Sequence, residues 1–326
     1  YVPEEIEFQT KQQIALAQVK HALSNGIQVK AWTFDEAYGK DCQFLDAMEK
    51  LNQAYVCEIP CDFHGWLSQP KVIRRQPKRS RKRGPRTNVP RVRKADVSRR
   101  VDNLVTYSPV FTEQNWQRYR VKDTDRGPEV WEVKWAWFWR KTIDKLPAKQ
   151  HTLIVARNVR TGEVKFFLSN RVLGRDGVTL RWLLHVAFGR WAIEACFRTA
   201  KEELGLDHFE VRGWRCVHRH WFVTQLSHLF CSRLRQQWDD LPEVDPLHKL
   251  TIEQVRAAVN TYLRNRDLPP PQRIERFEFE IRRQSYYQNR NAQAIKSHTK
   301  TRRELYESIG IDVDKIKSCK PTNDSP

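Results

Sequence analysis

The sequence predicts an α/β protein with parallel strands that binds an anionic polymer, and three observations support this. A helical pattern over residues 10–26 precedes an apolar run at 28–34, and a second pattern over 41–53 precedes another run at 54–60. Two such alternations are typical of parallel strands joined by helices. The 58 Lys and Arg residues exceed the 39 Asp and Glu residues and leave a net charge of +19. This excess favours a phosphate-rich partner, and we expect nucleic acid.

Both predicted helices begin at a residue suited to cap them. Thr10 precedes apolar residues at helical spacing, and Asn25-Gly26 ends that pattern. Asp41 stands before the second helix, whose apolar residues fall on one face. The run AYVCEIP then follows as a strand.

Asp35 ends the first apolar run, in the stretch QVKAWTFDEAYG. Aspartate often caps the helix that follows a strand, and this interpretation needs no chemistry. Open α/β sheets also bind their ligands at the carboxyl ends of strands, where a carboxylate is a natural metal ligand. The local sequence leaves both interpretations open.

A strongly basic segment follows, with fourteen Lys or Arg residues and a single acid, Asp96, over residues 71–100. It has too few apolar residues to fold alone, so we expect a mobile loop that contacts a polyanion. A solvated linker is the alternative. The candidate DNA-binding residues are Arg74, Arg75, Lys78, Arg79, Arg81, Lys82, Arg83 and Arg86.

The seven cysteines favour reduced thiols rather than a disulfide framework, since their number is odd and most stand in apolar surroundings. Two sets have loosely metal-like spacing but lack the paired C-x₂-C pattern of structural zinc sites, so buried thiols are the favoured interpretation. The sets are Cys57, Cys61 and His64, and Cys216, His218 and His220. The sequence has no run of 20 apolar residues and no secretion signal at its start, so we expect no membrane partner and no export.

Strand patterns dominate the middle of the chain. The segment EVWEVKWAWFWRK alternates large apolar residues with others, and Thr161-Gly162 separates two further β-rich runs as a hairpin turn would. The tryptophans are expected to pack a sheet core, and a platform for base stacking is the alternative.

A long helix is predicted next, from Leu180 to about Trp214. Arg190, Glu194 and Lys201 share one of its faces, because they are four and seven residues apart. Their apolar neighbours indicate a closely packed stripe, where an acid needs a metal or a cation as its partner. An ordinary salt-bridged surface is the alternative.

The arrangement R-x₃-E-x₆-K of these three residues is similar to the second half of the Y-x₂-R-x₃-E-x₆-K signature of IS4-type DDE transposases. Together with DEAYG, YVCEIP and the late YYQNRNAQAIKSHTKTRR, it resembles transposases of the IS701-like DDE superfamily. Ala187 stands where the signature has tyrosine. The acids before Asp35 are Glu4, Glu5 and Glu7, so the N-terminal part with the family's first catalytic Asp is expected to be lacking.

The resemblance implies an RNase H-like nuclease core with a β-rich insertion. It implies that Asp35 and Glu194 bind two Mg²⁺ or Mn²⁺ ions, that Lys201 holds a DNA phosphate, and that Arg190 orients the glutamate or holds a second phosphate. The substrate would be double-stranded DNA, as transposon ends and target, bound by a homodimer in the bacterial cytosol with the nucleoid. A catalytically inactive DNA-binding remnant of a transposase is the second hypothesis, and an RNA-binding protein is the third.

Five segments are expected on these grounds. They are residues 1–60, part of the core with Asp35; 61–104, the basic insert; 105–178, the β-rich insertion; 179–235, the core helix with Glu194; and 236–326, a helical, basic region.

Overall fold

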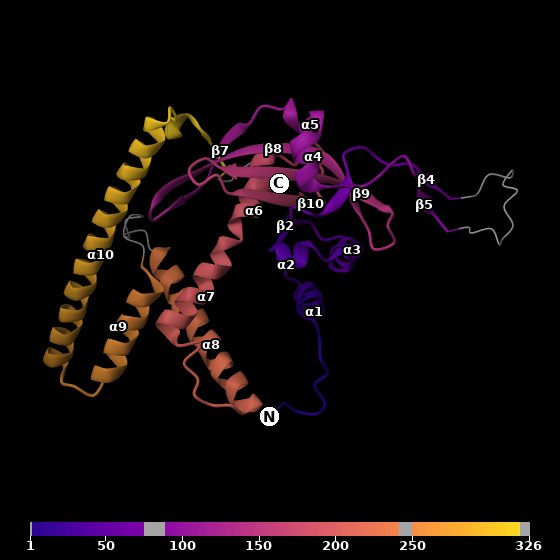
Figure 1. Cartoon of the computed structure of the whole chain (residues 1–326). Helices are drawn as coiled ribbons and strands as arrows, with labels where there is room; N and C mark the ends of the chain where they lie inside the picture. Colours follow the sequence, from indigo (N-terminus) through magenta and orange to yellow (C-terminus); the bar gives the residue numbers. More distant parts are fainter. Residues whose placement is uncertain (1, 75–88, 241–249, 320–326) are drawn as a thin grey trace, which may run out of the picture. The chain divides into compact units, whose positions relative to one another are not determined.

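A computed structural model describes residues 2–74, 89–240 and 250–319 of the chain (Figure 1). Contacts between residues divide the chain into two compact units. The first, here called the sheet unit, comprises Gln9–Arg190 and Thr299–Pro326. The second, here called the helical unit, comprises Tyr1–Phe8 and Trp191–His298.

The sheet unit is built on a mixed, nine-stranded sheet of order β1-β2-β10-β9-β8-β3-β6, in which β7 pairs with β8 and β11 pairs with β7. A separate two-stranded ladder joins β4 to β5. The strands are β1 Trp32–Phe34, β2 Tyr55–Ile59, β3 His64–Trp66, β4 Val72–Ile73, β5 Arg91–Val92, β6 Arg99–Arg100, β7 Gln117–Thr124, β8 Gly127–Lys141, β9 Pro147–Asn158, β10 Val164–Ser169 and β11 Lys317–Ser318.

Strands β1 and β2 run parallel, with Trp32 opposite Tyr55 and Phe34 opposite Cys57. This confirms the parallel pairing that the first two alternations of helix and strand predict. Strand β10 continues the sheet antiparallel to β2, so strands of the β-rich segment join the same sheet as Asp35's strand. Whether that segment is an insertion into a nuclease core stays a prediction.

Two helices of the sheet unit begin as predicted. Thr10 accepts from the backbone N–H of Gln13 in a full capping box, and Asp41 accepts from two backbone N–H groups of the next helix. The helices of this unit are α1 Lys11–Ser24, α2 Glu36–Gly39, α3 Cys42–Lys50, α4 Val101–Tyr107, α5 Pro109–Thr112, α6 Leu180–Gly189 and the short 3-10 helix Val313–Lys315. Helices α4 and α5 stand partly where strands were predicted, because Pro109 opens a new helical turn after Ser108.

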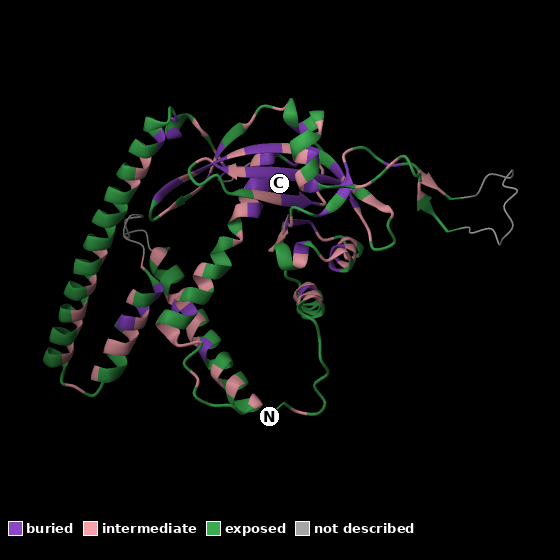
Figure 2. Cartoon of the chain, in the orientation of Figure 1, coloured by how far each residue is buried: buried purple, intermediate pink, exposed green. Residues whose placement is uncertain are grey.

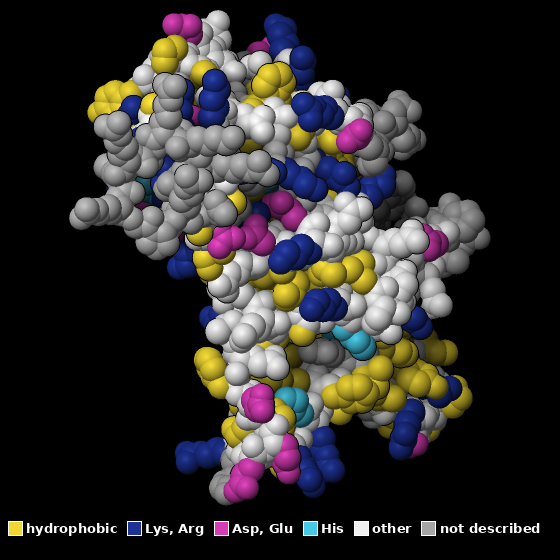
Figure 3. All heavy atoms as spheres, turned by 90° about the vertical axis from the view of Figure 1, so that its right-hand side faces the viewer, with side chains coloured by type: hydrophobic (Ala, Val, Ile, Leu, Met, Phe, Trp, Pro, Cys, Tyr) yellow, Lys and Arg dark blue, Asp and Glu magenta, His cyan; other side chains and the backbone are white. Residues whose placement is uncertain are grey.

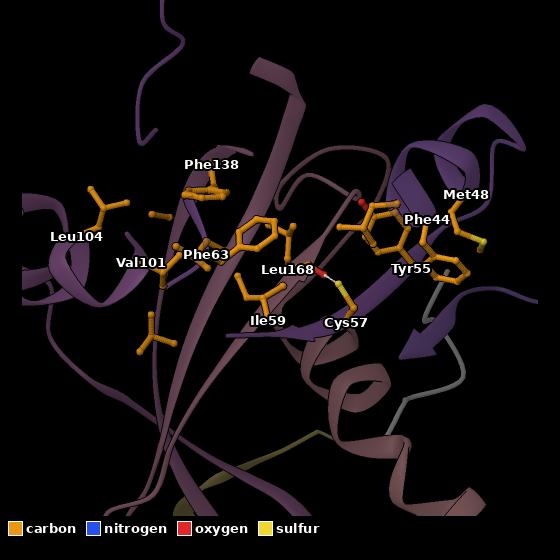
Figure 4. Close-up of a cluster of buried hydrophobic side chains, with 14 of the residues drawn as sticks. Phe44, Met48, Tyr55, Cys57, Ile59, Phe63, Val101, Leu104, Phe138 and Leu168 are labelled. Carbon is orange, nitrogen blue, oxygen red and sulfur yellow. Dashed lines mark hydrogen bonds between the residues drawn. The ribbon is translucent and has the colours of Figure 1, made fainter. Parts of the chain in front are cut away.

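The sheet has a hydrophobic core on each face. Residues of α1, α3 and α4 pack on one face, where side chains of β2 point into a cluster with Phe44 and Met48 (Figure 4). Helix α6 packs on the other face, against Trp131 and Val133 among others. Figure 2 shows buried residues concentrated in the strands.

The tryptophans of β8 divide between buried and exposed surroundings. Trp131 is 3% exposed within the core beneath α6, whereas Trp137 is 49% exposed, with its ring centroid 6.3 Å from that of Trp135. The sheet-core interpretation therefore holds for Trp131. Base stacking by the exposed rings stays a prediction.

The helical unit contains α7 Trp191–Leu204, α8 Trp214–Asp239, α9 Ile252–Asn265 and most of α10 Pro270–Ser308. The single helix predicted from Leu180 to about Trp214 is wrong. It divides at Arg190, which follows the end of α6. The second part, α7, ends before Gly205, whose φ of +70° lies in the left-handed region that favours glycine. Among the described residues, no helix is long and apolar enough to cross a membrane.

Candidate functional site

Asp35 stands at the carboxyl end of β1 and begins α2. Its Oδ1 accepts a hydrogen bond from the backbone N–H of Ala37 at 3.0 Å, which confirms the capping interpretation. One oxygen is enough for the cap, and among the described residues no hydrogen bond or ion pair engages Oδ2. The side chain is half-buried, so the cap leaves a carboxylate oxygen that is able to bind a ligand.

Helix α2 is held on β2 through Gly39, which is buried. A Cβ at this position would collide with the backbone carbonyl oxygen of Glu58. The absence of a side chain at Gly39 therefore sets how closely the helix that begins at Asp35 approaches the sheet.

We expect Gly39→Ala to destabilise the protein by about 1–3 kcal/mol, the usual cost of overpacking, because a backbone carbonyl cannot rotate away as a side chain does. Urea unfolding measures this loss. Gly189→Ala is the matched control, since a Cβ there meets nothing within 4 Å and Ala favours the helix. Equal stability of the two variants would contradict the close packing of α2 on β2.

Glu194 lies in the first turn of α7 and is exposed. Its apolar neighbours are exposed as well, with Trp191 at 45% and Phe197 at 53%. The closely packed stripe that the sequence indicates is therefore wrong for this structure. Lys201 is exposed in the last turn of the same helix.

The four predicted catalytic residues are divided between the two units. Asp35 and Arg190 belong to the sheet unit, and Glu194 and Lys201 belong to the helical unit. The approach of Asp35 to Glu194 stays a prediction. A shared pair of ions would require the two carboxylates to lie within about 8 Å of each other.

Neither unit alone gathers a metal site. No group of three His, Cys, Asp or Glu side chains suited to a metal occurs in the described part of the chain. Burial raises the pKa of Cys57, one of the weighed zinc ligands, to about 12, and its thiol donates to the carbonyl oxygen of Leu168 (Figure 4). Asp35 and Glu194 have the carboxylate oxygens that Mg²⁺ takes as ligands.

One of the predicted DNA-binding residues, Arg74, lies within the described part of the chain. It directly follows β4 and is exposed. The others lie outside the described residues: Arg75, Lys78, Arg79, Arg81, Lys82, Arg83 and Arg86.

Asp96 joins the beginning of this basic segment to its later part and to β3 through hydrogen bonds. Its carboxylate accepts from the backbone N–H of Lys71 and from Arg93, both at 2.9 Å, and its carbonyl oxygen accepts from the indole N–H of Trp66. The sequence marks Asp96 as the single acid of the segment, a signal that sequence reasoning did not use.

A buried ion cluster lies between α3 and the sheet, and the sequence did not predict it. Arg140, at the end of β8, is 0% exposed and makes ion pairs with Asp46 and Glu49 of α3. His151 lies beside them, also 0% exposed, with Nε2 3.0 Å from the Glu49 carboxylate and Nδ1 2.7 Å from a backbone carbonyl. Both ring nitrogens lie within hydrogen-bond distance of an oxygen atom.

This cluster shifts the pKa of Glu49. Burial alone would raise it, but the hydrogen bond from His151 and the charges of His151 and Arg140 outweigh burial and lower it to about 2. The hydroxyl of Tyr55 also donates to this carboxylate at 3.0 Å. The cluster ties α3, which follows the helix begun by Asp35, to β2, β8 and β9.

Comparison with known proteins finds a similarity for the first part of the chain. No curated protein matches the chain. Residues 1–128 match the family described as DDE superfamily endonuclease, a segment that contains Asp35 and the basic residues but not Glu194. The match supports a relationship of this part of the chain to the DDE-type endonucleases and transposases.

Proposed function

We propose that the protein is a DDE-type transposase that cleaves and joins DNA strands at the ends of an insertion sequence. The observation that carries the proposal is the position of Asp35, at the carboxyl end of a parallel strand within the segment that matches DDE endonucleases. Ligands of open α/β sheets bind at this edge. The test is strand nicking by the protein and by variants of the two proposed carboxylates.

Asp35 and Glu194 would hold Mg²⁺ or Mn²⁺ in this proposal. Bound divalent ions supply an activated oxygen nucleophile and stabilise the leaving oxygen of a phosphodiester. Asp35 stands at the strand end, where the Ala37 N–H donates to Oδ1 and so restricts the orientation of the carboxylate. Residues 9–31 contain no acid, so a further carboxylate would have to come from elsewhere.

Arg190 and Lys201 would bind phosphate groups of the DNA. An arginine contacts two phosphate oxygens at once, whereas a lysine acts as a mobile point charge. Their positions before and within α7 place one such group on each side of Glu194 along the chain. The subtype, IS4 or IS701, is part of this proposal and rests on the motif around these residues.

A DNA-binding remnant without nuclease activity is the second candidate. The net charge of +19 favours it as strongly as it favours an enzyme, and Lys and Arg side chains are spread over the face of the molecule in Figure 3. Strand nicking separates the two candidates, because both bind DNA and only one cuts it.

Binding to duplex DNA should tolerate changes of sequence and weaken steeply as salt rises, because phosphates neutralised by Lys and Arg release counterions. Deleting residues 75–88, which hold most of the predicted DNA-binding residues, should flatten the plot of log affinity against log salt. Each lost phosphate contact changes that slope by about 0.9. Fluorescence anisotropy on a labelled duplex measures it.

The matched control for this deletion replaces the same residues with a Gly/Ser linker of equal length, which should behave as the deletion does. An unchanged slope in both proteins would mean that the segment is a linker that does not contact DNA.

A further inference from the structure

A cavity of about 420 Å³ opens in the sheet unit, close to the end of α2. Three segments that are distant in the sequence form its wall: the junction of α2 and α3, the turn after β2, and the end of β8. Its polar lining consists of Lys40, Cys42, Asp62, His64, Lys141 and Thr142.

The lining carries more positive than negative charge, with two lysines and one aspartate. Lys40 and Lys141 make no ion pair with any described residue, and Asp62 is the single acid of the wall. Thr142 is already engaged, because its hydroxyl donates to the carbonyl oxygen of Leu146. Two ammonium groups and the ring of His64 are left as donors toward the cavity.

Arg140, which precedes the cavity residue Lys141 in β8, is paired with Asp46 and Glu49 but has one guanidinium nitrogen without a partner among the described residues. Nη1 of Arg140 is buried and has no hydrogen-bond partner among the described residues, although Nη2 is held by α3. The guanidinium lies near Cys42, which lines the cavity: burial raises the pKa of this thiol, the charge of Arg140 lowers it, and the charges of Asp46 and Asp41 add to the rise.

We propose that this cavity binds a phosphate group. A tetrahedral anion offers acceptors in several directions, which suits donors that converge from three segments. The volume also admits the sugar next to a phosphate, so a phosphodiester of nucleic acid fits as well as free phosphate. Helix α2 runs from Glu36 to Gly39 with Asp35 as its N-cap, and its four residues span about 6 Å.

The identification of the phosphate with a DNA strand rests on the proposed function, whereas the anion site itself does not. If both hold, Lys40 and Lys141 position the strand beside the carboxylate of Asp35. They would then be positioning residues, because they touch the backbone and not the reacting atoms.

The experiment measures alkylation of Cys42 by iodoacetamide in the whole protein, with peptide mass spectrometry to separate it from Cys216 of the helical unit. Inorganic phosphate should slow alkylation of Cys42 and leave Cys216 unchanged. Lys40→Gln and Lys141→Gln should each raise the phosphate concentration for half-protection about tenfold. Asp62→Asn should lower it several-fold, a change of opposite sign that general damage to the fold would not produce.

Lys20→Gln is the matched control, since it removes the same charge from an exposed position on α1 of the same unit. An equal effect of Lys20→Gln, or no protection of Cys42 by phosphate or by DNA, would overturn the proposal. Protection by a short duplex at lower concentration, with the same response to the variants, would identify the phosphate as that of DNA. Protection by inorganic phosphate alone would leave the anion site standing without its link to the nuclease.

Discussion

Replacing Asp35 with asparagine should lower DNA strand cleavage about a thousandfold, and replacing Glu194 with glutamine should do the same, a loss of about 4 kcal/mol of transition-state stabilisation. An amide keeps the shape of each side chain but removes the anionic oxygen that binds a divalent cation. The measurement is nicking of supercoiled plasmid with Mg²⁺ or Mn²⁺.

The Asp35→Asn substitution separates the two roles of this residue. Asparagine caps a helix about as well as aspartate, so α2 should form normally in the variant. Glu202→Gln, a change of an exposed acid on the same helix as Glu194, is the second control and should leave cleavage unchanged. Full activity of the Asp35→Asn variant would mean that Asp35 only caps α2. A wild-type protein that binds DNA but never nicks it would favour the second candidate, a DNA-binding remnant without nuclease activity.

The second large effect concerns stability. Arg140→Met should destabilise the protein by about 3–5 kcal/mol, because it leaves two carboxylates of α3 beside the core without their buried partner. Urea unfolding gives the change. Arg118→Met is the control, since its pair with Glu132 is 46% exposed on the arginine side and should cost about 1 kcal/mol or less.

The same cluster predicts how stability depends on pH. The pKa of Glu49 falls from 4.5 to about 2 on folding, so its ionised form stabilises the fold above pH 4.5 by about 3 kcal/mol. This contribution is lost as the pH falls from 4.5 toward 2. Glu49→Gln should therefore show a weaker acid dependence over this range, and an unchanged dependence would contradict the cluster.

The fold was predictable from the sequence where its signals are local. Thr10 and Asp41 cap their helices within three residues, and Thr161-Gly162 forms the turn between β9 and β10, where Gly162 has a φ of +73°. Such features depend on a few adjacent residues, so their pattern is visible without any knowledge of the fold.

The features that were missed depend on residues far apart. Arg140 meets Asp46 and Glu49 across more than 90 positions, and nothing near Arg140 in the sequence marks it as buried. The break at Arg190 was also invisible, because the helical pattern continues through it.

The candidate site was predictable only in part. The position of Asp35 at a strand end follows from a local pattern, whereas the surroundings of Glu194 depend on how α7 packs, and the packed stripe inferred from its neighbours was wrong. The cavity beside Lys40 combines three distant segments and has no counterpart in any local motif.

The central claim is that Asp35 and Glu194 bind one pair of metal ions. Replacing Mg²⁺ with Fe²⁺, and adding ascorbate and peroxide, generates hydroxyl radicals that cut the backbone next to the bound ion. The account predicts cuts near both Asp35 and Glu194 in the protein bound to DNA, and the loss of both sets in either Asp35→Asn or Glu194→Gln. Cuts near one residue that persist when the other is replaced would contradict a shared site.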